Sequence, residues 1–122
     1  MLNIIVIVSS VTLNASAQIF LKMGMGTVVF PAQWTVSTTF KLALWAALNP
    51  YIIGGLACYA FSVLIWMYVL AHTEVSYAYP FLSIGFALVT VLGWIIFNDS
   101  LSVQRVSGIA LICLGVVLVS RT

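Results

Sequence analysis

Charged side chains are scarce in this sequence. Four basic and two acidic residues make up 5% of its 122 residues, while 64% are hydrophobic. Because soluble domains carry about 25% charged residues, a soluble fold of this length could not cover its surface with so few charges. A lipid environment removes this difficulty, so the composition predicts an integral membrane protein.

Other scarcities exclude further classes of protein. The net charge of +2 is too small, and its basic residues too scattered, to indicate a nucleic-acid partner. The single histidine, His72, and the two cysteines, Cys58 and Cys113, form no ligand motif, so we expect no metal and no cofactor. His72 beside Glu74 is typical of a hydrated turn. Without a catalytic triad, paired intramembrane acids or a glycine-rich phosphate loop, an enzyme is the least expected class.

Four long uncharged runs are present instead. Crossing about 30 Å of hydrocarbon takes about 20 helical residues, and the runs predict spans near 2–22, 51–71, 76–97 and 104–120. The first run has neither a preceding basic segment nor a small-residue cleavage site, so we interpret it as a retained span. Asn49-Pro50 and Ser102 are typical helix starts. Residues 1–122 are therefore expected to form one all-α domain of four transmembrane helices.

The one long connection lies between the first two spans. Residues 27–35 contain Pro31 and are predicted to be irregular, whereas residues 37–48 have a helical pattern. Four large apolar residues of this segment fall on one face: Phe40, Leu44, Trp45 and Leu48. This pattern indicates an amphipathic helix in the membrane interface. An extension of the second span fits the pattern equally well.

The first span carries a polar stripe at successive i, i+4 positions: Ser10, Asn14, Gln18 and Lys22. Polar groups are costly in hydrocarbon, so the stripe should face the bundle or a hydrated cavity. One interpretation is a substrate groove with Lys22 at its mouth to meet an anion. The alternative is hydrogen bonding between helices together with a snorkelling lysine.

The third span combines hydroxyl groups with an internal proline. Ser76, Ser83 and Thr90 are spaced by seven residues, and Tyr79 precedes Pro80. Pro80 is predicted to kink the helix. Such a kink is tolerated where it lines a cavity, but a bend that serves only packing fits equally well.

Alternating crossings place four charged residues on one side of the membrane: Lys22, Lys41, Asp99 and Arg105. This side could hold a phosphate, with Asp99 pairing Lys22 or Arg105, or contacting a cationic or hydroxylated group. Ordinary anchoring to lipid headgroups is the alternative. The positive-inside rule favours the cytoplasm for this side, by a small margin over the side that carries Arg121.

The fourth span has two glycines, Gly108 and Gly115, on one face. A face of small residues can pack tightly against another helix in lipid. Because four short helices offer little protein to enclose a path, we expect a dimer with these glycines at its interface.

Three segments resemble a known family. They are Ala17 to Lys22 (AQIFLK), Ala78 to Ser83 (AYPFLS) and Gly108 to Val116 (GIALICLGV). With the four-helix plan, they resemble the small EamA-like members of the drug/metabolite transporter superfamily, which includes the small multidrug resistance proteins. Within it, the chain is most similar to the subunits that flip aminoarabinose-phospho-undecaprenol across the bacterial inner membrane, where an acidic turn like Asn98-Asp99 follows the third helix.

The resemblance implies a flippase of the bacterial inner membrane for a polyprenyl-phosphate-linked sugar or a similar anionic lipid. The lipid tail would stay in the bilayer, and the working unit would be a homodimer or a heterodimer with a sister four-helix subunit. Lys22 and Arg105 would hold the phosphate, and Asp99 would lie beside them. The head would be hydrogen-bonded by Asn14, Gln18, Tyr79 and Ser83.

Two positions depart from the multidrug exporters. Asn14 stands where their membrane-embedded glutamate would fall, and Leu82 replaces the tryptophan expected in the third helix. Asparagine cannot release a proton in this pH range, which argues against a proton-coupled exporter of aromatic cations. The alternatives are an exporter of small molecules or cations that lacks the usual glutamate, and an accessory membrane subunit that does not transport.

Overall fold

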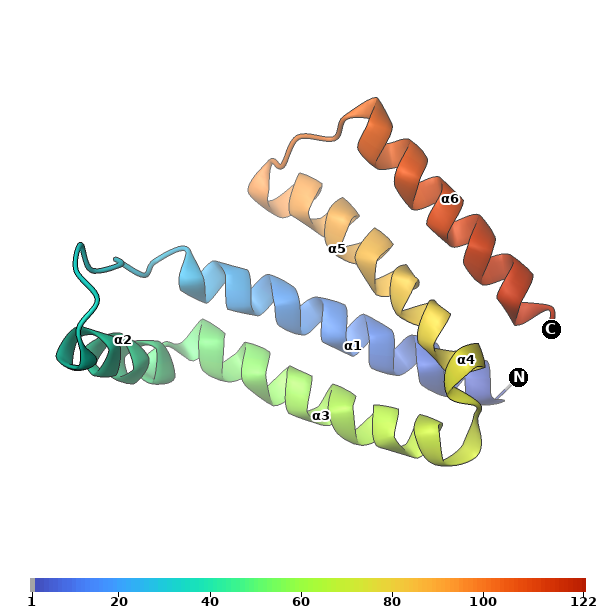
Figure 1. Ribbon diagram of the computed structural model, residues 1–122, viewed down its shortest axis with the longest axis horizontal. Coiled ribbons are helices and arrows are strands. Elements are labelled where there is room, and N and C mark those ends of the chain that lie inside the picture. Colours follow the sequence, from blue (N-terminus) through green and yellow to red (C-terminus); the bar gives the residue numbers. More distant parts are fainter. Residues whose placement is uncertain (1) are drawn as a thin grey trace.

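The computed structural model describes residues 2–122, and all of its regular elements are helical (Figure 1). Their order is α1 (Leu2–Met25), α2 (Val36–Leu48), α3 (Pro50–His72), α4 (Val75–Ala78), the 3-10 turn η1 (Tyr79–Phe81), α5 (Leu82–Phe97) and α6 (Val103–Ser120). Within residues 2–122, four segments are long and apolar enough to cross a membrane: Asn3–Met25, Pro50–His72, Val75–Phe97 and Val103–Ser120. The predicted four-helix plan is confirmed.

Side-chain caps set the starts of two spans. The Asn49 side-chain oxygen accepts a hydrogen bond from the backbone N–H of Tyr51 at 2.9 Å, and Pro50 occupies the first turn of α3. The Ser102 hydroxyl oxygen accepts one from the backbone N–H of Arg105 at 3.1 Å. Each cap satisfies an N–H group that the helix itself leaves without a partner. Both predicted helix starts are therefore confirmed.

Helix α2 is separate from α3, so its interpretation as an extension of the second span is wrong. Asn49 has an extended backbone between the two helices, because the ring of Pro50 disfavours helical geometry in the preceding residue. In Figure 1, α2 turns away from the direction of α3. Its predicted apolar face is exposed at Phe40, Leu44, Trp45 and Leu48. Its place in the membrane interface stays a prediction.

Helices α1 and α3 run antiparallel, side by side (Figure 1), and pack through glycines. A Cβ atom on Gly55 would lie 2.9 Å from the Leu21 Cγ and 3.1 Å from the carbonyl oxygen of Ala17. A Cβ atom on Gly24 would lie 2.4 Å from the Ile52 Cγ1. Small residues allow this close approach, which replaces the hydrophobic driving force that lipid removes.

The predicted interruption at Pro80 is confirmed. Helix α4 gives way to the 3-10 turn η1 before α5 begins, because Pro80 has no N–H to donate and its ring clashes with the preceding turn. The turn is anchored by Phe81, which is buried in the core with Ile7 and Val11 of α1. It leaves the neighbouring Tyr79 exposed.

Helix α6 lies at the edge of the bundle beside α5 and does not cover α1 or α3 (Figure 1). It is anchored by Val116, which joins the core, while most of its other large apolar side chains are exposed. The outer face of α6 is thus available to lipid or to another helix. Helices α1, α3 and α5 form the part of the bundle that positions the candidate site.

Candidate functional site

A pocket of roughly 180 Å³ opens about halfway along α1 and α3. We call it the central pocket. It is lined by Ser10, Val11 and Asn14 of α1, by Tyr59, Ser62, Val63 and Trp66 of α3, by Tyr79 of η1 and by Leu82 of α5. It therefore combines amide, hydroxyl and aromatic groups within the membrane-spanning part of the chain.

One wall of the central pocket is a pair of serines. The Ser10 hydroxyl donates to the carbonyl oxygen of Ser62 at 2.9 Å, and the Ser62 hydroxyl donates to the carbonyl oxygen of Ser10 at 3.0 Å. Both side chains are buried. For Ser10, the interpretation as a hydrogen bond between helices is thus the one that the structure supports.

Asn14 and Tyr79, together with the exposed Tyr59, contribute accessible polar groups to the central pocket. Asn14 is half-buried and Tyr79 is exposed. The Tyr79 ring meets the Trp66 ring edge-on, with centroids 6.4 Å apart. An amide and a phenol each donate and accept hydrogen bonds, and aromatic faces cover apolar surface or attract a cation. This combination suits the polar head of an amphiphile.

The other two residues predicted to bind the head lie outside this pocket. Gln18 is exposed one turn further along α1, and Ser83 is half-buried near the start of α5. Neither is among the lining residues. Gln18 and Ser83 therefore belong neither to this pocket nor to the group of charged residues at the end of the bundle.

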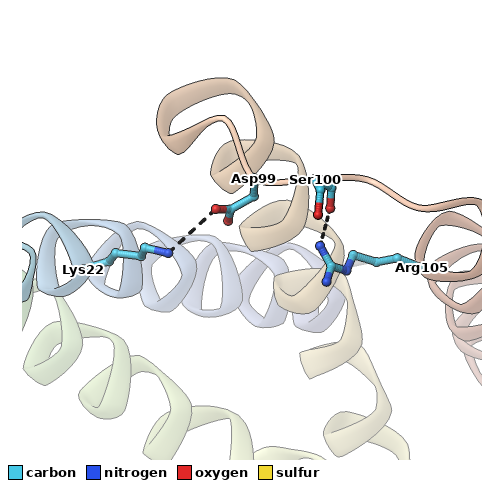
Figure 2. A network of polar contacts seen from close by, with 4 residues as sticks. All are labelled: Lys22, Asp99, Ser100 and Arg105. Atoms are coloured by element: carbon cyan, nitrogen blue, oxygen red, sulfur yellow. Dashed lines mark hydrogen bonds and ion pairs between the residues drawn. The ribbon is translucent and has the colours of Figure 1, made fainter.

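This group of charged residues, which we call the end cluster, is built around Lys22 and Asp99. The Lys22 Nζ lies 3.8 Å from the Asp99 Oδ1 (Figure 2) and 5.0 Å above the centroid of the Phe97 ring. The sequence offered Lys22 or Arg105 as the partner of Asp99. In the structure the ion pair forms with Lys22. The pair joins the last turns of α1 to the loop that follows α5.

The turn after α5 determines where the Asp99 carboxylate lies. Asn98 adopts the left-handed conformation, with φ 55°, which asparagine tolerates better than most residues. The backbone N–H of Asp99 then donates to the carbonyl oxygen of Gly93 at 3.2 Å. A Cβ atom on Gly93 would lie 2.6 Å from the Asp99 Oδ2. The Asp99 carboxylate can therefore lie against Gly93 only because Gly93 has no side chain.

Arg105 lies on the other side of Asp99. Its guanidinium donates to the carbonyl oxygen of Ser100 (Figure 2). Asp99, Ser100 and Arg105 line a pocket of roughly 450 Å³ with Val89, Thr90 and Leu101. Lys41 lines a different pocket, between α2 and the first loop. Two of the three predicted basic residues therefore flank Asp99, and the third does not.

The ion pair between Lys22 and Asp99 is exposed and therefore weak. The side chains of Lys22 and Asp99 are 58% and 44% exposed, and exposed ion pairs contribute about 1 kcal/mol or less. A ligand that carries charge could therefore separate Lys22 from Asp99 at low cost.

Four contributing residues were not predicted from the sequence. Tyr59, Ser62 and Trp66 line the central pocket, and Phe97 lies under Lys22. The first three are spaced by three and four residues, which places them on one face of a helix. That spacing was a signal for a polar and aromatic stripe on α3. The role of Phe97 has no such signal, because it depends on how α1 and α5 meet.

The chain is similar to a family of transporters and to several named proteins. Residues 3–121 match the model of the EamA-like transporter family. A probable 4-amino-4-deoxy-L-arabinose-phosphoundecaprenol flippase subunit ArnF of Serratia proteamaculans is 33% identical over 116 residues, covering 92% of this chain and 87% of the relative. The ArnF relative of Pseudomonas fluorescens strain Pf0-1 is 32% identical over 121 residues, covering 97% and 87%.

A relative named as the probable ArnE subunit of the same flippase, from Pseudomonas syringae, is 42% identical over 67 residues. These residues are 55% of this chain and 62% of the relative, so the match spans less than two thirds of that protein. No solved structure matches the chain.

These matches confirm the resemblance predicted from the three motifs. The family is one of transporters and the relatives are named as flippase subunits, which confirms the expectation that the chain is not an enzyme. Together with the four apolar helices, they identify a multi-pass protein of the bacterial inner membrane. The chain belongs to the EamA-like transporter family.

Proposed function

We propose that this chain is one subunit of a flippase that moves a polyprenyl-phosphate-linked amino sugar across the inner membrane. The names of the relatives supply the substrate class. The observation that carries the proposal is the pairing of two sites along α1. Asn14 opens into the central pocket, and Lys22 is exposed at the end of the same helix.

The two sites suit two successive positions of such a head. The lipid tail stays in the bilayer, where the outer faces of the helices are apolar. Lys22 meets the phosphate at the membrane boundary, with Arg105 nearby on α6. The head then moves into the central pocket, where Asn14 and Tyr79 hydrogen-bond the hydroxyl groups of the sugar. Gln18 and Ser83 are proposed to contact the head as it moves between the two sites.

A second four-helix subunit completes the path in this proposal. The relatives carry two different subunit names, ArnE and ArnF. Gly108 and Gly115 lie on a face of α6 where an added Cβ would meet no atom of residues 2–122 within 4 Å, apart from its chain neighbours and the adjacent backbone of α6 itself. We propose this glycine face as the interface, either with a sister subunit or with a second copy of the chain.

The test measures flipping in vesicles. The tagged chain is purified from its own host membrane in mild detergent, so that a partner subunit stays attached, and is reconstituted with a labelled polyprenyl-phosphate amino sugar. Wild-type protein should move the lipid, and Lys22→Ala should slow it on the order of tenfold, because a hydrogen bond to a charged group contributes about 1.5–3 kcal/mol.

The matched control is Lys41→Ala. It also removes one lysine charge from this end of the bundle, but Lys41 lines a different pocket. It should flip the lipid at nearly the wild-type rate. Equal rates for wild type and Lys22→Ala would remove the phosphate role of Lys22. Equal losses in both variants would indicate general anchoring to headgroups. Wild-type vesicles no faster than protein-free vesicles would overturn the proposed function.

A further inference from the structure

The end cluster presents two opposite charges side by side. The Lys22 ammonium and the Asp99 carboxylate are 3.8 Å apart, and both are accessible. The substrate class proposed above has the same composition of charge. A 4-amino sugar linked through a phosphodiester carries an ammonium group and an anionic phosphate on the two sides of one sugar ring. The head and the end cluster are therefore each a pair of opposite charges.

Each member of the ion pair has a second contact that does not involve the other member. The Lys22 ammonium also lies over the Phe97 ring, and an aromatic face attracts a cation. The Asp99 carboxylate is placed by its own turn, through the backbone hydrogen bond to Gly93. Each residue therefore keeps one contact when a ligand replaces the other member of the ion pair.

We propose that the substrate head is recognised by exchange of this ion pair. The phosphodiester binds Lys22, and the sugar ammonium binds Asp99. Asp99 is then the residue that selects an amino sugar over a neutral one. This inference rests on the proposed function and deepens it. No bond is formed or broken in the head, and only the pairing of charges changes.

The distribution of acids supports this assignment. The sequence contains two acidic residues, Glu74 and Asp99. Glu74 precedes α4, whereas Asp99 follows α5, at opposite ends of the segment that crosses the membrane. An amino sugar that arrives beside Lys22 thus meets one carboxylate. A charge that enters a medium of low dielectric constant without a partner pays a large desolvation cost, so a head whose charges are both paired approaches the membrane more readily.

The experiment compares two lipids that differ only in the substituent on the sugar nitrogen. One is the polyprenyl-phosphate amino sugar, and the other is its N-acetyl derivative, which has no positive charge. Both are reconstituted with the purified assembly. Wild-type protein should flip the amino lipid on the order of tenfold faster than the acetylated one. Asp99→Asn should bring this ratio close to one by slowing the amino lipid alone.

Two further variants sharpen the test. Glu74→Gln removes the acid at the other end and should keep the wild-type ratio. Gly93→Ala keeps the Asp99 charge but displaces it, because the new Cβ would lie 2.6 Å from the Oδ2. It should lower the ratio in the same direction as Asp99→Asn, and it provides the readout if Asp99→Asn fails to fold.

The outcomes separate the inference from the proposed function. An unchanged ratio in Asp99→Asn, with wild type still flipping the amino lipid, overturns the inference and leaves the proposed function in place. If Asp99→Asn slows both lipids equally, Asp99 has a structural role, and this outcome also overturns the inference. If wild type flips neither lipid, the proposed function fails and the inference falls with it.

Discussion

The hydroxyl groups of Ser10 and Ser62 each donate to the carbonyl oxygen of the other residue, at 2.9 and 3.0 Å, where α1 meets α3. Both side chains are 2% exposed, so each hydroxyl finds its partner inside the protein. The reciprocal pair fixes the relative height of the two helices. It thereby places Asn14, one turn further along α1, in the central pocket.

The serine pair predicts a measurable loss of stability. Ser10→Ala should lower the free energy of unfolding by about 0.6 kcal/mol, and by no more than about 1.7 kcal/mol, the range found for hydrogen bonds between membrane helices. Reversible unfolding in mixed micelles measures it. The matched control is Ser9→Ala, because the Ser9 hydroxyl donates to Ile5 within its own helix. Equal losses in the two variants would show that the contact between the helices contributes nothing.

The glycine contact between α1 and α3 predicts a contrast between neighbours. Gly55→Ala should destabilise the protein by about 1–3 kcal/mol through overpacking, because its Cβ would lie 3.1 Å from the backbone oxygen of Ala17. Gly54→Ala should be close to neutral, since its Cβ would meet no atom of residues 2–122 within 4 Å apart from its chain neighbours and the adjacent backbone of α3. The same unfolding assay measures both. A neutral Gly55→Ala would mean that the helices separate freely at this point.

Much of the fold could be predicted because it depends on single helices. The spans follow from apolar length, the caps at Asn49 and Ser102 from local hydrogen bonds, and the interruption at Pro80 from its missing N–H. The sequence does not decide whether α2 is a separate helix or part of α3, because Pro50 is compatible both with the start of a new helix and with a kink in a longer one. The extended backbone of Asn49 decides it.

The site could be predicted only in part, for a geometric reason. Residues four apart on a helix of 3.6 residues per turn differ by about 40° in direction, so the polar stripe of α1 turns by about 120° over its length. Ser10 therefore faces α3, Asn14 the central pocket, and Gln18 is exposed. Asp99 pairs with Lys22 and not with Arg105 because Gly93 and the left-handed Asn98 determine where its carboxylate lies. The periodicity of the sequence does not indicate this geometry.

The central pocket predicts that Asn14 contributes to transport. Asn14→Ala should slow flipping roughly fivefold, the effect of about 1 kcal/mol lost with one hydrogen bond to the head. Ser16→Ala is the control on the same helix, because the Ser16 hydroxyl donates to Thr12 and does not line the pocket. Both are measured in the reconstituted vesicles. A rate for Asn14→Ala equal to that of Ser16→Ala would remove the amide from the path.

The glycine face of α6 predicts the effect of added bulk on association. Gly108→Leu and Gly115→Leu should each weaken the proposed dimer by about 1–3 kcal/mol through overpacking. The subunit should stay folded, because a Cβ at either position meets no atom of residues 2–122 within 4 Å apart from its chain neighbours and the adjacent backbone of α6. Ala110→Leu adds similar bulk to a different, exposed face of α6 and should leave association unchanged. Single-molecule photobleaching in vesicles counts the subunits, and circular dichroism checks the helix content. If the glycine variants associate as wild type does, this face of α6 is not the interface, and any association uses another face of the bundle.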